Sequence, residues 1–488
     1  MTTKAPIIGY APDADPATPG VLTNCVSLVP TLKGMAGAPS AVSAGLSALA
    51  SACLGAASLL RLDATSSLFA GTSTKLYEDV SGTWTDRTRA VGGDYSPASD
   101  VRWSFAQYGN VSLAAVKSDT LQYSVTGAFA NISGAPKASY VETVANFVML
   151  ADYDDGTDTP NGVYWSALGD YTDWTADIDT QCGFVSLTDT PGRNIGLKRF
   201  GRNVIVYKQR SMYLGTYVGS PVIWDFALIP GETGAASNYC IVDVGTSDDP
   251  RHIFMGYEDF YSFDGSRPVP LGTNVIKETV FGELNKTYAN ATFALHDRIN
   301  SRIYFYYPTS ASTTPNKCVV YNYRSNRWGR DDRSVEAVVE YISAGTTYDD
   351  LGTLYSTYAD LPGVSYDSGI WAGGYPIPAY FDTSHVLQTL TGASSTSQLT
   401  TGDIGEDTQQ ILISRVKPRF ITAPTSATMT NYYRYNLGDA LTTDTTVNMS
   451  SSRFDVLREA RWHRFNIAFV GDHEETGLVY DAQGSGSE

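Results

Sequence analysis

Cysteine, histidine and positive charge are all scarce in this chain of 488 residues. The five cysteines are scattered and never in CxxC spacing, so the sequence predicts neither a disulfide framework nor a zinc site. The five histidines show no HExxH or paired spacing, and we expect structural roles for them. The chain has 34 Lys and Arg against 51 Asp and Glu, which gives a net charge of −17. This charge argues against a protein that binds nucleic acid by neutralising its phosphates.

Long apolar runs are also missing, apart from one stretch without charge between residues 33 and 61. It is long enough to span a bilayer, but it consists mostly of Ala, Ser and Gly, so membrane insertion would be weakly driven. Leu46, Leu49, Cys53 and Leu54 fall on one face at helical spacing. We therefore predict a packed Ala-rich helix or a close-packed linker, with a membrane segment as the alternative.

Signals for targeting and for nucleotide chemistry are absent as well. The N-terminus lacks a basic region followed by an apolar core, so no secretory signal is expected and synthesis in a cytoplasm is predicted. There is no Walker loop and no dinucleotide fingerprint. We expect no cofactor and no enzymatic activity.

One acidic loop carries the pattern of a metal site. Asp152, Asp154 and Asp158 offer carboxylate oxygens at even spacing, which calcium favours. The loop lacks the closing glutamate and the flanking helices of an EF-hand. We prefer a solvated acidic loop, and calcium binding remains the alternative.

Aromatic residues, in contrast, are abundant, with 32 tyrosines in the chain. Seven times an aromatic strand end is followed by a turn, and the successive tyrosines lie 41 to 60 residues apart. A four-stranded propeller blade repeats about every 40–50 residues. The pattern predicts an all-β fold with a β-propeller-like body of six or seven blades, marked by Tyr77, Tyr123, Tyr164, Tyr213, Tyr261, Tyr321 and Tyr380.

Changes in composition divide the chain into three parts. Residues 1–62 are rich in Pro, Gly, Ala and Ser and predict an extended arm followed by the Ala-rich helix. Residues 63–394 contain the short strands of the propeller. After a polar boundary near Ser395, residues 395–488 predict a β-sandwich-like C-terminal domain.

A propeller by itself is compatible with a scaffold, a carbohydrate- or receptor-binding protein, or a glycan hydrolase. The segment 169–174 superficially resembles the turn motif of sialidase-type propellers, but its spacing does not match. A retaining glycosidase needs two carboxyl groups about 5 Å apart. The sequence cannot place such a pair among its acidic residues, so these alternatives stay open.

Several short segments, each spanning a predicted strand and turn, resemble those of a known family. The chain is similar to the tail hub or nozzle proteins of short-tailed bacteriophages, also described as packaged-DNA stabilisation proteins. The similar segments are GYAPDADP at 9–16, LFAGT at 68–72, VYWSALGD at 163–170, VYKQRSMY at 206–213, FYSFDGS at 260–266 and VYNY at 320–323.

The resemblance implies a structural role in the virion tail. In that family six copies form a ring below the portal and its adaptor, and this ring encloses the DNA exit channel. The ring retains packaged DNA and anchors tail fibres, spikes or a needle. An acidic lumen would let DNA slide without sequence-specific binding, because carboxylates repel the phosphate backbone.

Overall fold

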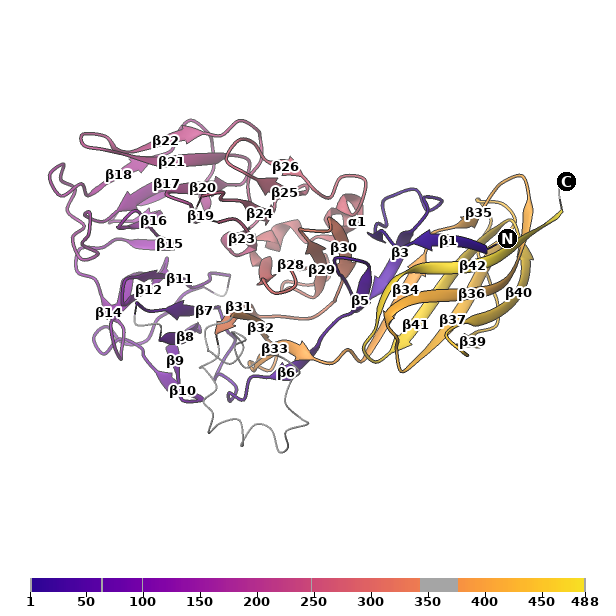
Figure 1. Ribbon diagram of the computed structural model, residues 1–488. Helices are drawn as coiled ribbons and strands as arrows, with labels where there is room; N and C mark the ends of the chain where they lie inside the picture. Colours follow the sequence, from indigo (N-terminus) through magenta and orange to yellow (C-terminus); the bar gives the residue numbers. More distant parts are fainter. Residues whose placement is uncertain (1, 63–64, 99, 247, 343–375, 487–488) are drawn as a thin grey trace.

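The computed structural model describes residues 2–62, 65–98, 100–246, 248–342 and 376–486. Within these ranges the chain is almost entirely β-structure, which confirms the predicted all-β class. Its sheets form a β-propeller-like body with further β-structure beside it (Figure 1). The helical elements are short: α1 (Lys277–Glu283), η1 (Asn238–Cys240) and η2 (Lys286–Ala291).

Four antiparallel sheets of the body have four strands each and are separate from one another. In three of them the strands follow one another in the chain, whereas the fourth takes its last strand from near the N-terminus. Their strands are β7 (Gly55–Leu60), β8 (Ser66–Gly71), β9 (Leu76–Val80) and β10 (Thr83–Asp86); β19 (Asn194–Phe200), β20 (Asn203–Lys208), β21 (Met212–Gly219) and β22 (Ile223–Leu228); β23 (Ile241–Asp243), β24 (His252–Met255), β25 (Phe260–Phe263) and β26 (Val269–Pro270); and β31 (Ala337–Ile342), β32 (Pro376–Phe381), β33 (Leu387–Gly392) and β6 (Ser40–Ser43).

The other strands of the body belong to larger sheets. An eight-stranded sheet consists of two four-stranded parts that are joined through a single residue pair, Thr120 with Lys137. A ten-stranded sheet begins with four strands of the body and continues beyond it. The strands are β11 (Ser104–Tyr108), β12 (Val111–Val116), β13 (Asp119–Ser124) and β14 (Ala130–Asn131); β15 (Lys137–Val144), β16 (Phe147–Asp154), β17 (Asp158–Trp165) and β18 (Gly183–Ser186); and β27 (Phe293–Asp297), β28 (Arg302–Tyr307), β29 (Lys317–Asn322) and β30 (Arg327–Arg330).

The first strands of these four-stranded units surround the middle of the body (Figure 1). Contacts join β31 to β7, β7 to β11, β11 to β15 and β15 to β19. On the other side β23 contacts β27, β27 contacts β31, and η1 touches both β19 and β27. The first strands thus form the wall of a central channel.

The tyrosine repeat marks a constant position in these units. Six of the seven tyrosines lie on the third strand of their unit, namely on β9, β13, β17, β21, β25 and β29. The seventh, Tyr380, lies on the second strand, β32. Four of these tyrosines are buried, namely Tyr164, Tyr213, Tyr321 and Tyr380, and Tyr213 has no exposed surface. A Tyr on each unit therefore packs against a neighbouring sheet while its hydroxyl remains available for a polar contact.

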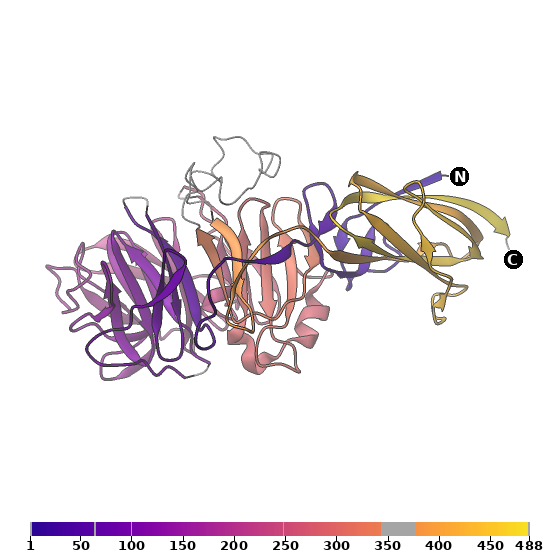
Figure 2. The same cartoon turned by 90° about the horizontal axis from the view of Figure 1, so that it is seen from below.

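The C-terminal strands build a second β-structure beside the propeller (Figure 2). Two sheets make it up, and strands from both ends of the chain pair within them. The N-terminal strands are β1 (Thr2–Pro6), β2 (Gly9–Tyr10), β3 (Val21–Val26), β4 (Leu28–Pro30) and β5 (Met35–Gly37); the C-terminal ones are β34 (Thr396–Thr401), β35 (Ile404–Gly405), β36 (Gln410–Thr422), β37 (Ser426–Arg434), β38 (Thr442–Thr443), β39 (Val447–Asn448), β40 (Phe454–Ala460), β41 (Trp462–Val470) and β42 (Glu474–Gly486).

The N-terminal strands connect the two parts of the molecule. The ten-stranded sheet runs from β27 through β30 into β4 and β5, and from there into β42, β36 and β40. One hydrophobic cluster follows the same route, because it contains Phe260 and Trp328 of the propeller together with Phe465 and Ile467 of β41. Segment 1–62 is thus built into both parts of the fold.

The Ala-rich helix predicted before residue 62 is wrong. Between β6 and β7 the chain makes bends and irregular turns, and its backbone is held by other segments. The Leu49 amide donates to the carbonyl of His385, and the Leu54 amide donates to the carbonyl of Gly71. The leucines at helical spacing are buried against other strands, so their spacing reflects burial and not a helix. In the described part of the chain, no helix is long and apolar enough to cross a membrane.

All five cysteines are buried and unpaired, as their scattered positions predicted. Burial raises the pKa of the Cys53 thiol to about 12, and its Sγ donates to the carbonyl of Gly55. A thiol with a raised pKa is protonated at neutral pH and is a poor nucleophile. These cysteines therefore act as small core residues.

Candidate functional site

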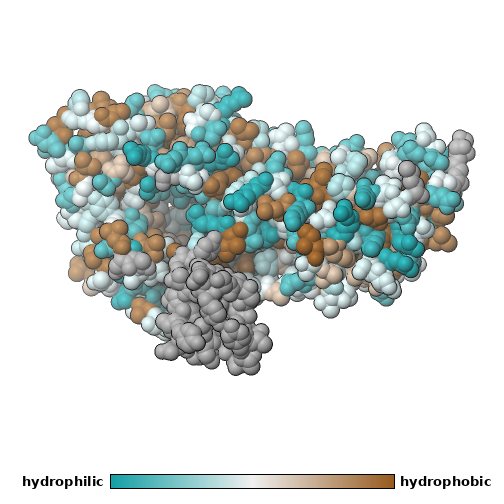
Figure 3. Space-filling view, viewed as in Figure 1, coloured by the Kyte–Doolittle hydropathy of each residue, from teal (hydrophilic) through white to brown (hydrophobic). Residues whose placement is uncertain are grey.

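The central channel of the propeller contains the larger of two neighbouring cavities. This cavity has a volume of about 610 Å³ and is lined by the first strands β7, β15, β19, β23, β27 and β31. The surface of the body is visibly hollowed near its middle (Figure 3). Three cations and three carboxylates lie in the lining: Lys198, Arg199, Arg298, Glu142, Asp243 and Glu340.

Two of these charges neutralise each other inside the channel. Arg298 donates to both oxygens of Glu340, with Nε–Oε2 at 2.7 Å and NH2–Oε1 at 3.3 Å. His296 lies nearby, but its Nδ1 is 3.9 Å from Glu340 Oε1, which is too far for a hydrogen bond. Burial and the adjacent Arg298 lower the pKa of His296 to about 3, so its imidazole is neutral. Burial has the opposite effect on the carboxyl group of Glu142, whose pKa it raises.

The channel therefore offers an ion-paired carboxylate, the half-buried carboxyl group of Glu142 with its raised pKa and a neutral imidazole, beside Asp243 and two further cations. Such a set can hydrogen-bond a polar ligand. A retaining glycosidase would need its two carboxyl groups to act together, one as an acid and one as a nucleophile. The Arg298 guanidinium instead stabilises the Glu340 carboxylate as a structural partner.

A second cavity of about 310 Å³ adjoins the first, and Tyr239 lines both. The Tyr239 ring packs against Phe293 with ring centroids 5.9 Å apart, and burial raises the pKa of its hydroxyl far above the usual value. The charged lining differs from that of the channel. Four cations and two carboxylates lie there: Arg102, Lys117, Arg193, Lys286, Asp100 and Asp152.

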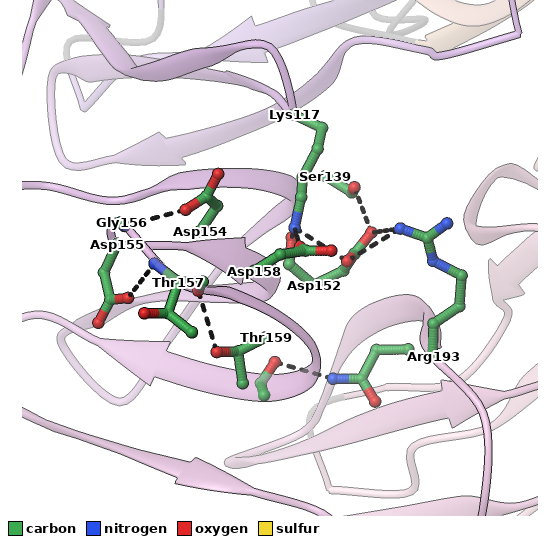
Figure 4. Close-up of polar contacts among 12 residues, drawn as sticks. Lys117, Ser139, Asp152, Asp154, Asp155, Gly156, Thr157, Asp158, Thr159 and Arg193 are labelled. Carbon is green, nitrogen blue, oxygen red and sulfur yellow. Dashed lines mark hydrogen bonds and ion pairs between the residues drawn. The ribbon is translucent and has the colours of Figure 1, made fainter.

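Asp152 is the organising residue of this second cavity (Figure 4). Its side chain is 2% exposed, and Lys117 Nζ donates to its Oδ1 at 3.0 Å while Arg193 NH2 donates to its Oδ2 at 3.0 Å. Ser139 Oγ donates to Oδ2 at 2.5 Å. The backbone of Asp152 has φ of +55°, a conformation that aspartate tolerates better than most residues.

These contacts join three units of the propeller. Lys117 follows β12, Ser139 lies on β15, and Arg193 immediately precedes β19. The Asp152 carboxylate thus links the sheets of β11–β14, β15–β18 and β19–β22. We call Asp152, Lys117, Ser139 and Arg193 the aspartate clamp.

The three aspartates considered for calcium do not meet at one point: Asp152 and Asp158 both pair with Lys117, and Asp154 lies apart from them in the hairpin turn. The left-handed backbone of Asp152, at a register shift between β16 and β17, directs its side chain to the clamp. Asp154 accepts from the Gly156 amide at 2.9 Å in the hairpin turn, and Asp158 pairs with Lys117 at 2.8 Å. Over the ranges that the structure describes, no three His, Cys, Asp or Glu side chains group as metal ligands. The calcium hypothesis gains no support.

Sequence reasoning singled out Asp152 but missed its partners. Lys117, Ser139 and Arg193 are separated from it by 35, 13 and 41 residues, and no local pattern connects them. Tyr239, the residue shared by the two cavities, lies outside the tyrosine repeat. Only the closure of the propeller brings these side chains together.

Comparison with known proteins adds little to this description. No protein-family model and no curated protein matches the chain. Among solved structures, YCF48 bound to D1 peptide is 11% identical and gives a TM-score of 0.38, over 74% of this chain and 97% of that one. An exo-beta-1,3-galactanase from Phanerochaete chrysosporium with galactose is 9% identical with a TM-score of 0.27, over 91% of this chain and 100% of that one. At these scores neither likeness supports an inference about function.

Proposed function

We propose that this protein is a structural subunit of a virion tail, which forms a ring-shaped hub or nozzle below a portal and its adaptor. The ring consists of six copies and encloses the DNA exit channel. It retains packaged DNA and anchors tail fibres, spikes or a needle. In this proposal the propeller has seven blades, and β6 closes the blade of β31, β32 and β33.

The observation that carries the proposal is the continuous sheet between the propeller and the C-terminal strands. Ten strands in one sheet, together with one hydrophobic cluster, join these two parts. Domains that are linked only by a peptide usually move against each other, whereas a large apolar contact holds them fixed. A rigid elongated subunit is what a wall that withstands the pressure of packaged DNA requires.

The charge of the chain agrees with a DNA conduit. A net charge of −17 per copy would concentrate negative potential in the lumen of a closed ring. DNA would be repelled from such a wall and could slide past it. The cavities of about 610 and 310 Å³ inside each propeller have the size of small-molecule sites, about 300–1,000 Å³, and not of a passage for a duplex. The DNA channel therefore lies between subunits in this proposal.

Sedimentation velocity and negative-stain microscopy of the purified chain, with and without a portal–adaptor complex, test the proposal. We expect rings of six copies with a central hole, formed by the protein alone or on the adaptor. A particle that remains a monomer at all concentrations and in the presence of the adaptor would contradict it.

A binding function is the second candidate, because the second cavity combines cations with hydroxyl and amide groups. Glycan hydrolysis has weaker support, since Glu340 is held in an ion pair with Arg298. We expect no release of chromophore from nitrophenyl glycosides by the purified protein. Release that disappears in Glu142→Gln would instead assign a catalytic acid to the channel.

A further inference from the structure

The second cavity has a cationic excess in a strongly acidic protein. Four cations and two carboxylates line it, and Asp158 outside the lining pairs with Lys117, so four cations meet three carboxylates. Asp152 is already occupied by Lys117 and Arg193. Lys286 lies on η2 at the rim, is exposed, and makes no ion pair with any residue that the structure describes. A site with spare positive charge selects an anion.

The rest of the lining is suited to a polyhydroxylated molecule. Hydroxyl and amide groups surround the cavity, and three aromatic rings provide flat apolar surfaces beside them. Gln209 Nε2 donates to the hydroxyl of Tyr257 at 3.2 Å, which leaves the Gln209 carbonyl oxygen available. Asn290 is exposed and its side chain makes no hydrogen bond within the described residues. The polar lining residues are Ser139, Tyr140, Gln209, Ser237, Tyr239, Tyr257, Thr287 and Asn290.

The aspartate clamp prearranges the cations before any ligand arrives. Asp152 fixes Lys117 on one side and Arg193 on the other, while 55% of the Arg193 side chain stays exposed. Side chains that are already ordered lose little conformational entropy on binding. The cavity volume of about 310 Å³ lies at the lower end of the range for small-molecule sites, about 300–1,000 Å³.

We propose that this cavity binds an acidic monosaccharide of the hexuronate type. The sugar carboxylate pairs with Lys286 and the exposed part of Arg193. Its hydroxyl groups exchange hydrogen bonds with Gln209 and Asn290, and one face of the pyranose ring lies against a tyrosine. Every lining residue belongs to one subunit, so the site does not depend on ring formation.

Isothermal titration of the full chain with glucuronate and galacturonate tests the site. For a ligand of this size in a preformed cavity we expect a Kd on the order of 1 mM for at least one uronate. Glucose, galactose, acetate and inorganic phosphate are titrated in parallel. All four should bind at least about fivefold more weakly, because each lacks either the carboxylate or the hydroxyl groups.

Two variants and one control connect binding to the cavity. Lys286→Gln should weaken uronate binding about fivefold, and Asn290→Ala should weaken uronate binding without changing the response to acetate. Lys417→Gln on β36 removes an equally exposed lysine far from the cavity and should bind like the original protein.

Three results would overturn the proposal. One is the absence of binding by both uronates, and another is phosphate or acetate binding as tightly as the uronate. The third is an equal loss of affinity in Lys417→Gln and Lys286→Gln. Because ring assembly is measured separately, failure here leaves the proposed structural function untouched.

Discussion

Two buried aspartates, one in the propeller and one among the C-terminal strands, hold pairs of cations in different ways. Asp152 joins side chains from three four-stranded units of the propeller. Asp403 accepts from Arg434 at 2.5 Å and from Arg464 at 3.0 Å, and these arginines lie on the directly paired strands β37 and β41. The first aspartate therefore couples units that share at most one backbone pair, whereas the second reinforces an extended ladder that already exists.

The two parts of the molecule should also differ in their response to acid, and this is the largest effect that we expect. Burial lowers the pKa of His252 to about 4 and of His296 to about 3 in the propeller, and lowers that of His463 to about 4 among the C-terminal strands. Below pH 6.5 the unfolded chain binds more protons than the folded one, so stability is complete above that pH and is lost as pH falls. Between pH 6.5 and 5 each histidine should contribute a loss of up to about 2 kcal/mol.

Urea unfolding at pH 7.5 and pH 5.0 measures this loss, and hydrogen exchange assigns it to a region. Burial also lowers the pKa of His473 among the C-terminal strands, but a hydrogen bond with the Gly471 carbonyl opposes that shift. We expect the amides of the propeller to lose more protection than those of the C-terminal strands, because the pKa values of both His252 and His296 are lowered to about 4 and about 3. Equal stability at the two pH values, or a greater loss in the C-terminal strands, would show that burial does not control these histidines.

Replacing each aspartate in turn measures how much Asp152 and Asp403 each contribute to stability. Asp403→Ala leaves two guanidinium groups that are only 13% and 18% exposed without a carboxylate, and should lower the free energy of unfolding by about 3–5 kcal/mol. Asp152→Ala should cost less, about 2–3 kcal/mol, because Lys117 keeps its pair with Asp158 and Arg193 reaches water.

The two alanine variants should also differ in the cooperativity of their unfolding by urea. Asp152→Ala should broaden the unfolding transition, because it uncouples neighbouring sheets, whereas Asp403→Ala should shift the transition without broadening it. Asp152→Asn, which tolerates the left-handed backbone and keeps one acceptor oxygen but no charge, is the matched control. If Asp152→Asn were as stable and as cooperative as the original protein, the charge of the clamp would be irrelevant.

A buried acid among the C-terminal strands should oppose the histidines. Both carboxyl oxygens of Glu475 are buried and make no well-oriented hydrogen bond among the described residues, while Oε2 lies 3.2 Å from Nε2 of the buried His473. Burial raises the pKa of Glu475 well above the usual value. Its contribution to stability is present below the unfolded pKa of about 4.3 and is lost as pH rises. Glu475→Gln should therefore stabilise the protein by about 1–2 kcal/mol at pH 8, and by nothing at pH 4. Thermal unfolding at both pH values decides this, and destabilisation at pH 8 would refute it.

The smallest effect concerns two tyrosine hydroxyls in the propeller. The hydroxyl of Tyr304 is buried without a partner in the described structure, so Tyr304→Phe should leave stability unchanged or raise it by up to about 1 kcal/mol. The hydroxyl of Tyr207 is 2.7 Å from His252 Nδ1, and Tyr207→Phe should lower stability by about 1 kcal/mol. Chemical denaturation of both variants measures the difference, and the reverse order would be inconsistent with these contacts.

The sequence predicted those features of the fold that repeat locally. One tyrosine in each unit was visible as a period, and it marks the third strand in six of seven cases. The predicted helix failed because Ala, Ser and Leu at helical spacing were buried by other strands. The pairing of β1 with β42 and of β6 with β33 joins residues from opposite ends of the chain, and no local pattern encodes such a contact.

The same limit applies to the candidate site. Asp152 stood out because it lies in an acidic loop, but that pattern suggested a metal ligand. Its partners are Ser139 and two cations that flank distant strands. Lys286 and Asn290 belong to a 3-10 helix without any sequence signature. A cavity whose walls come from many units becomes visible only when the propeller closes.

Electron cryomicroscopy of the assembled protein, alone and on a portal–adaptor complex, is the most direct test of the proposed tail function. We predict a ring of six copies around an open lumen, with the propeller and C-terminal strands of each copy fitted together as one rigid body. A monomer under all of these conditions would contradict that function, and an oligomer whose two parts take variable relative positions would contradict the rigid wall.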